Sequence, residues 1–306
     1  RTRRLFVEPL ESRIVLSAVR MLDGFQSNSL GAVDDASAGP VALGFRVDFF
    51  GSDHSQLYVN NNGNVTFDAP LSEWVPESLR DLPNEIIAPF WADVDTRDPD
   101  SGVVTYGTDE IDGHAAFGVN WIDVGYFDQN ADVTNSFQLV LIERPDVQAG
   151  AFDIEFNYDR VLWDTFDTGS EFVTSVTRAG FGDGSGAWGN SYELIGSGIV
   201  GSFLDSDPVT GLANNSLNST ESGRYAFEVR DGTMLDRLGL AGQRIPVDDG
   251  GFFLGQGIPA NQLRLVKTYN ADAADTTNTD QLWAGGDLGL NLDGAGLTVG
   301  IWDGGA

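Results

Sequence analysis

Hydrophobic and polar positions alternate one by one through the middle of the chain, from residue 21 to about residue 232. The segment AFDIEFNYD has a hydrophobic face of Phe152, Ile154, Phe156 and Tyr158 and a polar face of Asp153, Glu155 and Asn157. The same alternation recurs in Ala115–Trp121, Phe137–Leu141 and Tyr225–Val229. A period of two is typical of antiparallel strands with one buried face and one polar face. This part of the chain is therefore predicted to be mainly β.

Clusters of Gly, Asn, Asp and Pro separate the alternating segments and predict turns between strands. In QLYVNNNGNVTF, the pair Asn62-Gly63 lies between Leu57–Val59 and Val65–Phe67. Such a pair can adopt the positive φ of a tight turn, so this segment predicts a β-hairpin. Together the strands and turns predict an antiparallel β-sandwich-like domain with little helix.

Composition is compatible with this architecture and excludes some chemistry. The chain has 306 residues, 41% of them hydrophobic, and a prior of about 150 residues per domain suggests roughly two domains. It has no cysteine, which excludes disulfides, thiol catalysis and cysteine-based zinc sites. No apolar run approaches the roughly 18 to 20 residues of a membrane helix, so no membrane span is predicted.

The chain is strongly acidic, with a formal net charge of −29. Five of its 17 basic residues lie in the first twenty positions, so the acidity of the remainder is greater still. Such a surface repels nucleic acid and anionic lipid and attracts divalent cations or basic partners. Solubility in a salty medium explains the same charge equally well.

Residues 1–20 combine a basic start with a short apolar stretch that is too short for an ordinary secretory signal. The stretch from Arg4 through Glu8-Pro9-Leu10-Glu11 to Arg13 and Ala18 resembles the LEPR-type N-terminal segment of large planctomycete surface proteins, although the usual Leu-Glu-Pro-Arg order is split here. The resemblance implies a sorting segment and a secreted or cell-surface bacterial protein. The alternative is a frayed basic tail.

Six motifs occur in order within residues 21–232: FRVDFFGSDHSQLYVNNNGNVTF, IIAPFWADVDTRDPDSGVVTYG, AFGVNWIDVGYF, FQLVLIERPDVQAGAFDIEFNY, AGFGDGSGAWGNSYEL and GRYAFEV. With these motifs, residues 21–232 resemble the nidogen-like extracellular domain. The resemblance implies a non-catalytic module for adhesion or matrix contact, with an extracellular matrix or surface protein or glycan as its partner and no required cofactor.

The segment APFWADVDTRDPDSG contains four closely spaced aspartates that are candidate functional residues. Oxygen-only clusters suit Ca²⁺, which takes six to eight oxygen ligands, so a calcium site is one interpretation. Turn chemistry with an ion pair from Arg97 is a second, and partner recognition is a third. The candidate calcium ligands are Asp93, Asp95, Asp98 and Asp100, and the candidate ligand-binding residues are Trp91, Asp93 and Asp95.

Three further interpretations concern paired carboxylates, the histidines and the tryptophans. A glycosidase pair of carboxylates requires a sugar-sized cleft, of which the sequence gives no sign. His54 and His114 are in no metal-ligand spacing, and His54 is expected to be solvated. The tryptophans are expected in the core, with a carbohydrate groove as the alternative; they are Trp91, Trp121, Trp163 and Trp188.

After residue 232 the alternation stops. Residues 233–275 are rich in Gly and Pro and are predicted to be a linker. Residues 276–306 resemble the start of a subtilisin-like serine protease domain, with a helix at Thr276–Trp283 and a strand at Leu297–Trp302. The resemblance implies a short, incomplete α/β segment in which Asp303 is the triad aspartate. The alternative is a strand and turn of some other α/β domain.

Three hypotheses of function follow. The first is an adhesion or interaction module that is inert as an enzyme in this form. The second is an N-terminal fragment of a secreted subtilisin-like endopeptidase. No activity is expected from the fragment itself, because a triad aspartate alone does no chemistry and no histidine or serine follows Asp303. The third is a calcium-stabilised structural module, which a chelator would destabilise.

Overall fold

The computed structural model describes residues 21–167, 174–187, 190–230, 232–234, 244–246, 252–255 and 263–266. Within these residues every regular element is a strand, so the prediction of a mainly β fold is confirmed. The predicted N-terminal segment 1–20, the predicted helix Thr276–Trp283 and Asp303 lie outside the described residues.

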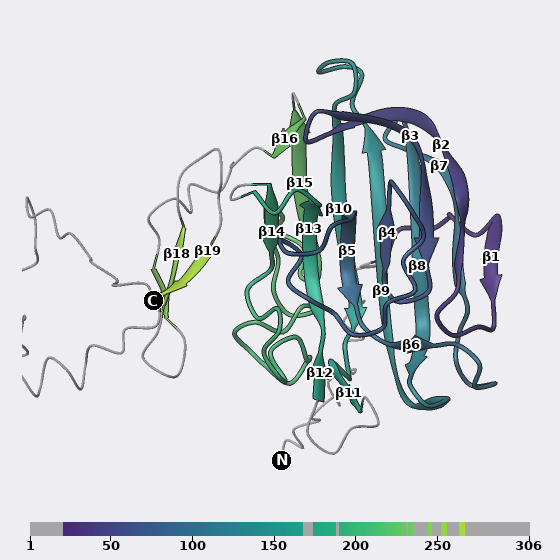
Figure 1. Ribbon diagram of the computed structural model, residues 1–306, viewed down its shortest axis with the longest axis vertical. Helices are drawn as coiled ribbons and strands as arrows, with labels where there is room; N and C mark the ends of the chain where they lie inside the picture. The colour runs from purple at the N-terminus through teal and green to yellow at the C-terminus, as the bar shows by residue number, and fades with distance from the viewer. Residues whose placement is uncertain are drawn as a thin grey trace, which may run out of the picture. The chain divides into compact units, whose positions relative to one another are not determined.

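The chain forms two compact units, and two large antiparallel sheets make up most of the first (Figure 1). The eight-stranded sheet has the order β1-β7-β8-β9-β10-β15-β16, with β6 also paired to β8. Its strands are β1 (Asn28–Gly31), β6 (Val94–Asp95), β7 (Val104–Ile111), β8 (His114–Tyr126), β9 (Asn130–Glu143), β10 (Phe152–Arg160), β15 (Arg224–Arg230) and β16 (Thr233–Met234).

The second large sheet has six strands in the order β14-β13-β5-β4-β3-β2. They are β2 (Ser37–Phe49), β3 (Ser52–Asn60), β4 (Asn64–Thr66), β5 (Glu85–Trp91), β13 (Arg178–Asp183) and β14 (Ser191–Glu193). A short ribbon pairs β11 (Thr165–Asp167) with β12 (Thr174–Val176). A three-stranded sheet lies in the segment predicted to be a linker; it has β17 (Arg244–Pro246), β18 (Phe252–Gly255) and β19 (Leu263–Val266).

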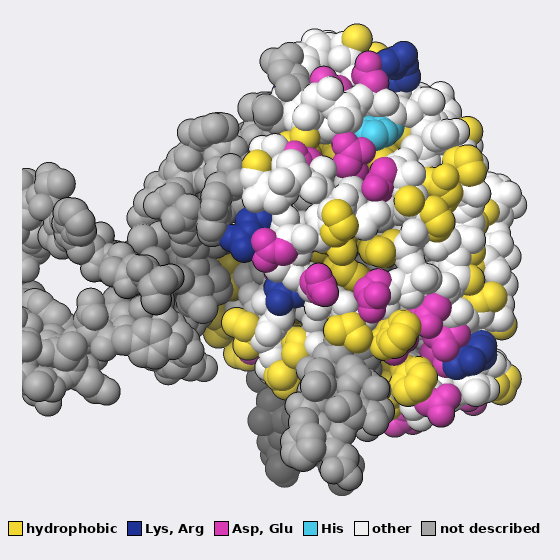
Figure 2. All heavy atoms as spheres, in the orientation of Figure 1, with side chains coloured by type: hydrophobic (Ala, Val, Ile, Leu, Met, Phe, Trp, Pro, Cys, Tyr) yellow, Lys and Arg dark blue, Asp and Glu magenta, His cyan; other side chains and the backbone are white. Residues whose placement is uncertain are grey.

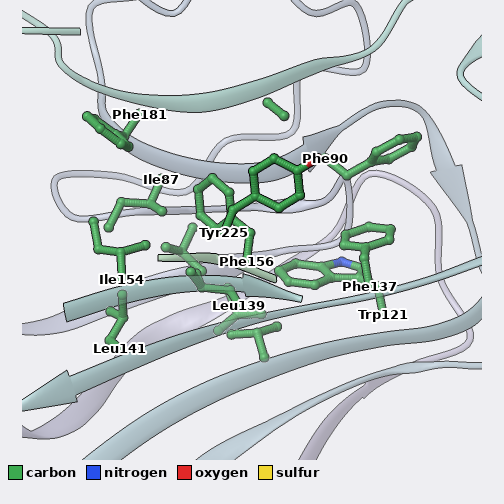
Figure 3. Close-up of a cluster of buried hydrophobic side chains, with 14 of the residues drawn as sticks. Ile87, Phe90, Trp121, Phe137, Leu139, Leu141, Ile154, Phe156, Phe181 and Tyr225 are labelled. Atoms are coloured by element: carbon green, nitrogen blue, oxygen red, sulfur yellow. The ribbon is translucent and has the colours of Figure 1, made fainter. Parts of the chain in front are cut away.

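Aromatic side chains fill the space between the two large sheets (Figure 3). Phe90 of β5 lies 5.0 Å from Phe137 of β9, which stacks at 5.1 Å on Trp121 of β8. Phe181 of β13 meets Phe227 of β15 edge-on at 5.3 Å. Such pairs contribute about 0.5 to 1.5 kcal/mol each beyond the burial of their area. The cross-sheet contacts explain why the two sheets pack face to face.

The hydrophobic face predicted for β10 is confirmed, whereas Ala115, at the start of the alternation predicted in β8, is exposed. Phe152, Ile154, Phe156 and Tyr158 are all 0% exposed. The hydroxyl of Tyr158 donates a hydrogen bond across the core to the carbonyl of Pro89, at 2.7 Å. A buried tyrosine hydroxyl needs such a partner, and here the partner lies on the opposite sheet.

The expected solvent exposure of the second face of β10 is wrong for Asn157 and Glu155, which are 1% and 4% exposed. Asn157 donates to Gln138 Oε1 (3.1 Å), and Gln138 Nε2 donates to Asn120 Oδ1 (2.7 Å) and to the carbonyl of Leu22 (2.9 Å). Glu155 pairs with an arginine of β15. Polar residues are buried on this face because the row Asn120, Gln138 and Asn157 satisfies its own hydrogen bonds and holds the backbone near Leu22.

The predicted hairpin at Asn62-Gly63 is confirmed. Asn60 pairs with Asn64, which leaves a three-residue turn in which Gly63 has a φ of 72°. Asn62 is not among the residues of positive φ. A Cβ at Gly63 would lie 1.8 Å from the carbonyl oxygen of Phe90, so the turn needs glycine for space as well as for its backbone conformation.

Replacing Gly63 by alanine tests this double requirement. Gly51→Ala is the matched control, because Gly51 also has a positive φ (87°) but nothing within 4 Å of its Cβ position. We expect Gly51→Ala to lower the free energy of unfolding by about 1 kcal/mol and Gly63→Ala by about 3 kcal/mol, since only the second adds a steric clash. Urea unfolding measures both, and equal losses would contradict the structural role of Gly63.

Candidate functional site

The chain passes from one large sheet to the other between β5 and β6, over Ala92 and Asp93. At this crossing the loop after β1 lies alongside β6. Asp34 forms an isolated antiparallel bridge with Asp95, and the backbone N–H of Thr96 donates to the carbonyl of Val33 at 3.0 Å. Residues distant in the sequence therefore meet at one place, which we call the acidic corner and define by Asp34, Asp35, Asp93 and Asp95.

The hairpin turn at residues 61–63 is hydrogen-bonded to the segments that carry the acidic corner. The side chain of Asn62 accepts a hydrogen bond from the N–H of Val94 (3.1 Å) and donates one to Asp35 Oδ1 (2.8 Å). The side-chain amide of Asn61 donates to the carbonyl of Val94. The N–H of Ala92 donates to the carbonyl of Asn62 at 3.2 Å. Because both asparagines are buried, these hydrogen bonds fix where the acids of the crossing segment lie.

Asp95 is held as an ion pair. Arg97 Nε donates to Asp95 Oδ1 at 2.9 Å and Arg97 Nη2 to Asp95 Oδ2 at 2.5 Å, and the N–H of Gln129 donates to Asp95 Oδ2 at 2.9 Å. Burial acts to raise the pKa of Asp95, but these hydrogen bonds outweigh it and hold the pKa below its usual value. The ion pair suggested by the sequence is confirmed.

The pKa values of Asp93 and Asp34 are shifted in the opposite direction from that of Asp95. Burial, followed by the charges of the neighbouring aspartates, raises the pKa of Asp93 to about 7 and that of Asp34 to about 6. Asp93 is 3% exposed, and its carboxylate has no hydrogen bond or ion pair among the described residues. Asp34 Oδ2 lies 2.8 Å from Arg97 Nη2, whereas Asp34 Oδ1 is buried and has no hydrogen-bond partner among the residues that the structure describes.

The acids brought together differ from the set considered from the sequence. One carboxylate oxygen from each of Asp34, Asp35 and Asp93 lies within 4.8 Å of the other two. Asp98 accepts a hydrogen bond from the N–H of Asp100 (2.8 Å) in a separate loop, where Asp98 is half-buried and Asp100 is exposed. The adjacent pair Asp34-Asp35 was not recognised, because only the pairing of its loop with β6 brings it to Asp93.

Trp91, considered as a ligand-binding residue, is 0% exposed, and its Nε1 donates to the carbonyl of Glu73 at 2.9 Å. It has no surface through which to contact a partner directly. Trp121 and Trp163 are also buried, so the expected core positions are confirmed for these three residues. Trp188 lies outside the described residues.

Two exposed aromatic residues that the sequence analysis did not single out lie next to the acidic corner. Trp74, 43% exposed, follows Glu73, whose carbonyl is also 3.5 Å from Asn62 Nδ2. Phe127, 36% exposed, donates its backbone N–H to the carbonyl of Asp93 at 3.2 Å. Figure 2 shows acidic, hydrophobic and basic side chains intermixed near the position of β6.

Each histidine of the chain faces a carboxylate. His54 Nε2 lies 2.9 Å from Glu85 Oε2, and the ring stacks on Phe67 with centroids 4.4 Å apart. The expectation that His54 is solvated is therefore wrong, since its side chain is 16% exposed. His114 Nδ1 lies 3.8 Å from Asp146.

The described residues contain no helix of the length and apolarity needed to cross a bilayer.

Two antiparallel sheets around an aromatic core, with an asparagine-rich turn buried against the crossing segment, define an all-β module whose candidate site is an acidic corner flanked by exposed aromatic residues. The chain belongs to the family of the nidogen-like domain, whose family model matches residues 55–231. This match confirms the nidogen-like resemblance seen in the sequence.

Relatives share the same region. The chain is 31% identical to alpha-tectorin of Mus musculus over an alignment of 233 residues that covers 67% of this chain and 10% of that protein. It is 28% identical to nidogen of Drosophila melanogaster over an alignment of 145 residues that covers 39% of this chain and 11% of that protein. The chain thus spans about a tenth of the length of these curated relatives. No solved structure matches it.

Removing the charge of Asp95 tests the role of the ion pair. We expect Asp95→Asn to lower the free energy of unfolding at neutral pH by about 2 kcal/mol, because Arg97 loses a buried partner but stays partly solvated. Asp100→Asn makes the same charge change at an exposed position and should stay within about 0.5 kcal/mol of the parent. Denaturant titration compares the two, and equal effects would show that the Asp95–Arg97 pair does not stabilise the fold.

Proposed function

We propose that this chain acts outside the cell as a non-catalytic interaction module that contacts an extracellular matrix or a surface protein or glycan. The observation that carries the proposal is the nidogen-like domain over residues 55–231. Its relatives alpha-tectorin and nidogen are extracellular matrix proteins, which supports the same setting for this chain. The predicted sorting segment at residues 1–20 supports export from a bacterial cell.

The acidic corner and its two exposed aromatic residues are the part of the surface that we assign to the partner. Exposed aromatic side chains supply large contact area and are enriched among the residues that dominate binding energy. Phe127 donates its backbone N–H to the carbonyl of Asp93, and the side chains of Trp91 and Asn62 donate to the carbonyl of Glu73, which precedes Trp74. These hydrogen bonds hold the backbone at both aromatic residues. Arg97, whose side chain is 38% exposed, offers a further contact at the acidic corner, since arginine is also enriched among the residues that dominate binding energy.

The charge of the chain restricts the chemistry of the partner. A net charge of −29 disfavours polyanions, so a protein surface or a neutral glycan fits better than a sulfated glycan. Trp91 contributes indirectly, because its hydrogen bond to the carbonyl of Glu73 positions the backbone before Trp74. Asp95 contributes in the same way, by holding Arg97 in place.

The second candidate function is the N-terminal part of a secreted subtilisin-like endopeptidase, with the nidogen-like domain directing it to a surface. The observation that favours it is the segment LTVGIWDGGA with Asp303. It is tested by expressing the natural gene product and measuring peptide hydrolysis. The endopeptidase hypothesis requires activity that Asp303→Asn abolishes; full activity in that variant would reject Asp303 as the triad aspartate.

Binding of the chain to immobilised collagen, laminin and a neutral polysaccharide tests the interaction module, with heparin as a polyanionic control. We expect saturable binding to at least one of the first three probes and none to heparin. Trp74→Ala and Phe127→Ala should each weaken that binding about tenfold, because each removes an exposed anchor at the proposed surface.

Val209→Ala is the matched control for these two variants, since Val209 is 61% exposed on a different loop. It should bind as the parent does, and all three variants should keep the melting temperature of the parent. Binding to heparin alone, or equal weakening by Val209→Ala, would reject the acidic corner as the contact surface.

A further inference from the structure

We propose that Asp34, Asp35 and Asp93 bind one Ca²⁺ ion, which links the loop after β1 to the segment where the chain changes sheets. The site differs from the set Asp93, Asp95, Asp98 and Asp100 considered from the sequence, with which it shares only Asp93. It does not depend on the proposed contact with a matrix, because the ion stabilises the module itself.

The geometry of the three carboxylates fits a single ion. Two oxygens that bind the same Ca²⁺ at about 2.4 Å lie at most about 4.8 Å apart. One oxygen each from Asp34, Asp35 and Asp93 meets this limit for every pair. Three anionic oxygen ligands suit a hard cation, and Ca²⁺ completes its six to eight ligands with water or backbone oxygens in flexible geometry.

A second observation, independent of this spacing, is that buried oxygens in the corner lack hydrogen-bond donors. Asp93 is 3% exposed, and its carboxylate has no hydrogen-bond donor or cation as a partner among the described residues. Within the part of the chain that the structure describes, Asp34 Oδ1 is buried without a partner, and so is Asn61 Oδ1 in the hairpin turn. Buried polar atoms are almost always satisfied in native proteins, so these oxygens are available to a bound ion or water.

The charges around the corner also favour a cation. Within the described residues, Arg97 is the one basic side chain that faces the acids. Its guanidinium donates two hydrogen bonds to Asp95, so its positive charge is already balanced by that carboxylate. Asp34 shares the same Nη2 group, and Asp128 approaches it at 4.0 Å. Asp35 and Asp93 have no cationic partner there. A divalent ion would compensate this uncancelled negative charge.

Calcium binding to the purified chain is measured by isothermal calorimetry and by thermal unfolding in calcium and in chelator. We expect one site per chain with a dissociation constant of about 10⁻⁴ to 10⁻³ M, the range of extracellular calcium modules. At a calcium concentration of about 100 times that constant, the melting temperature should rise by roughly 5 °C or more. Sodium chloride at equal ionic strength should not reproduce the rise.

Asp93→Asn is the decisive variant. Without calcium it should be at least as stable as the parent, because it removes a buried, unpaired charge, and with calcium its melting temperature should not change. Asp100→Asn makes the same charge change at an exposed position and should keep the full calcium response. If Asp93→Asn fails to fold, Asp35→Asn at a half-buried ligand position replaces it, with the same expected loss of response.

Three results would overturn the proposal. One is a calcium response of Asp93→Asn or Asp35→Asn equal to that of the parent. Another is a response lost in Asp100→Asn but kept in Asp93→Asn. The third is an equal rise in melting temperature with sodium chloride, which would reflect general screening of the acidic surface.

Discussion

The buried turn Asn61–Gly63 and the crossing segment it contacts are the constraint on which the rest of the structure depends. The N–H of Phe90 donates to the carbonyl of Gly63 (3.2 Å), and the indole of Trp121 donates to the carbonyl of Asn61 (3.0 Å). These bonds join a turn of the six-stranded sheet to β5 and to β8 of the eight-stranded sheet. They therefore set how the inner faces of the two sheets meet.

The same turn decides where the acids lie. Asn62 bonds both the N–H of Val94 and Asp35, so the loop after β1 and the crossing segment take their positions from one buried side chain. Two acids separated by one residue then acquire opposite properties. Asp95 is ionised and paired with Arg97, whereas Asp93 is enclosed with further carboxylates and without a donor. Environment, not residue type, separates a structural ion pair from a candidate metal ligand.

The exposed part of the corner depends on this buried part. The buried indole of Trp91 donates a hydrogen bond to the carbonyl of Glu73, the residue before the exposed Trp74. The exposed Phe127 donates its backbone N–H to the carbonyl of Asp93. A substitution of Trp91 or Asp93 is therefore expected to shift the backbone at Trp74 or at Phe127, respectively. This connection joins the proposed calcium site to the proposed contact surface, although each rests on separate observations.

Several features follow from short segments of the chain alone. The alternation in residues 152–158 predicted which side chains of β10 enter the core, Asn62-Gly63 predicted the turn, and Arg97 among neighbouring acids predicted an ion pair, because each of these patterns lies within a short segment. The burial of Asn157, the exposure of Trp74 and the meeting of Asp34 with Asp93 depend on strand pairing between distant segments. No local pattern encodes that pairing, since the register that joins Asp34 to Asp95 arises only when both sheets close over one core.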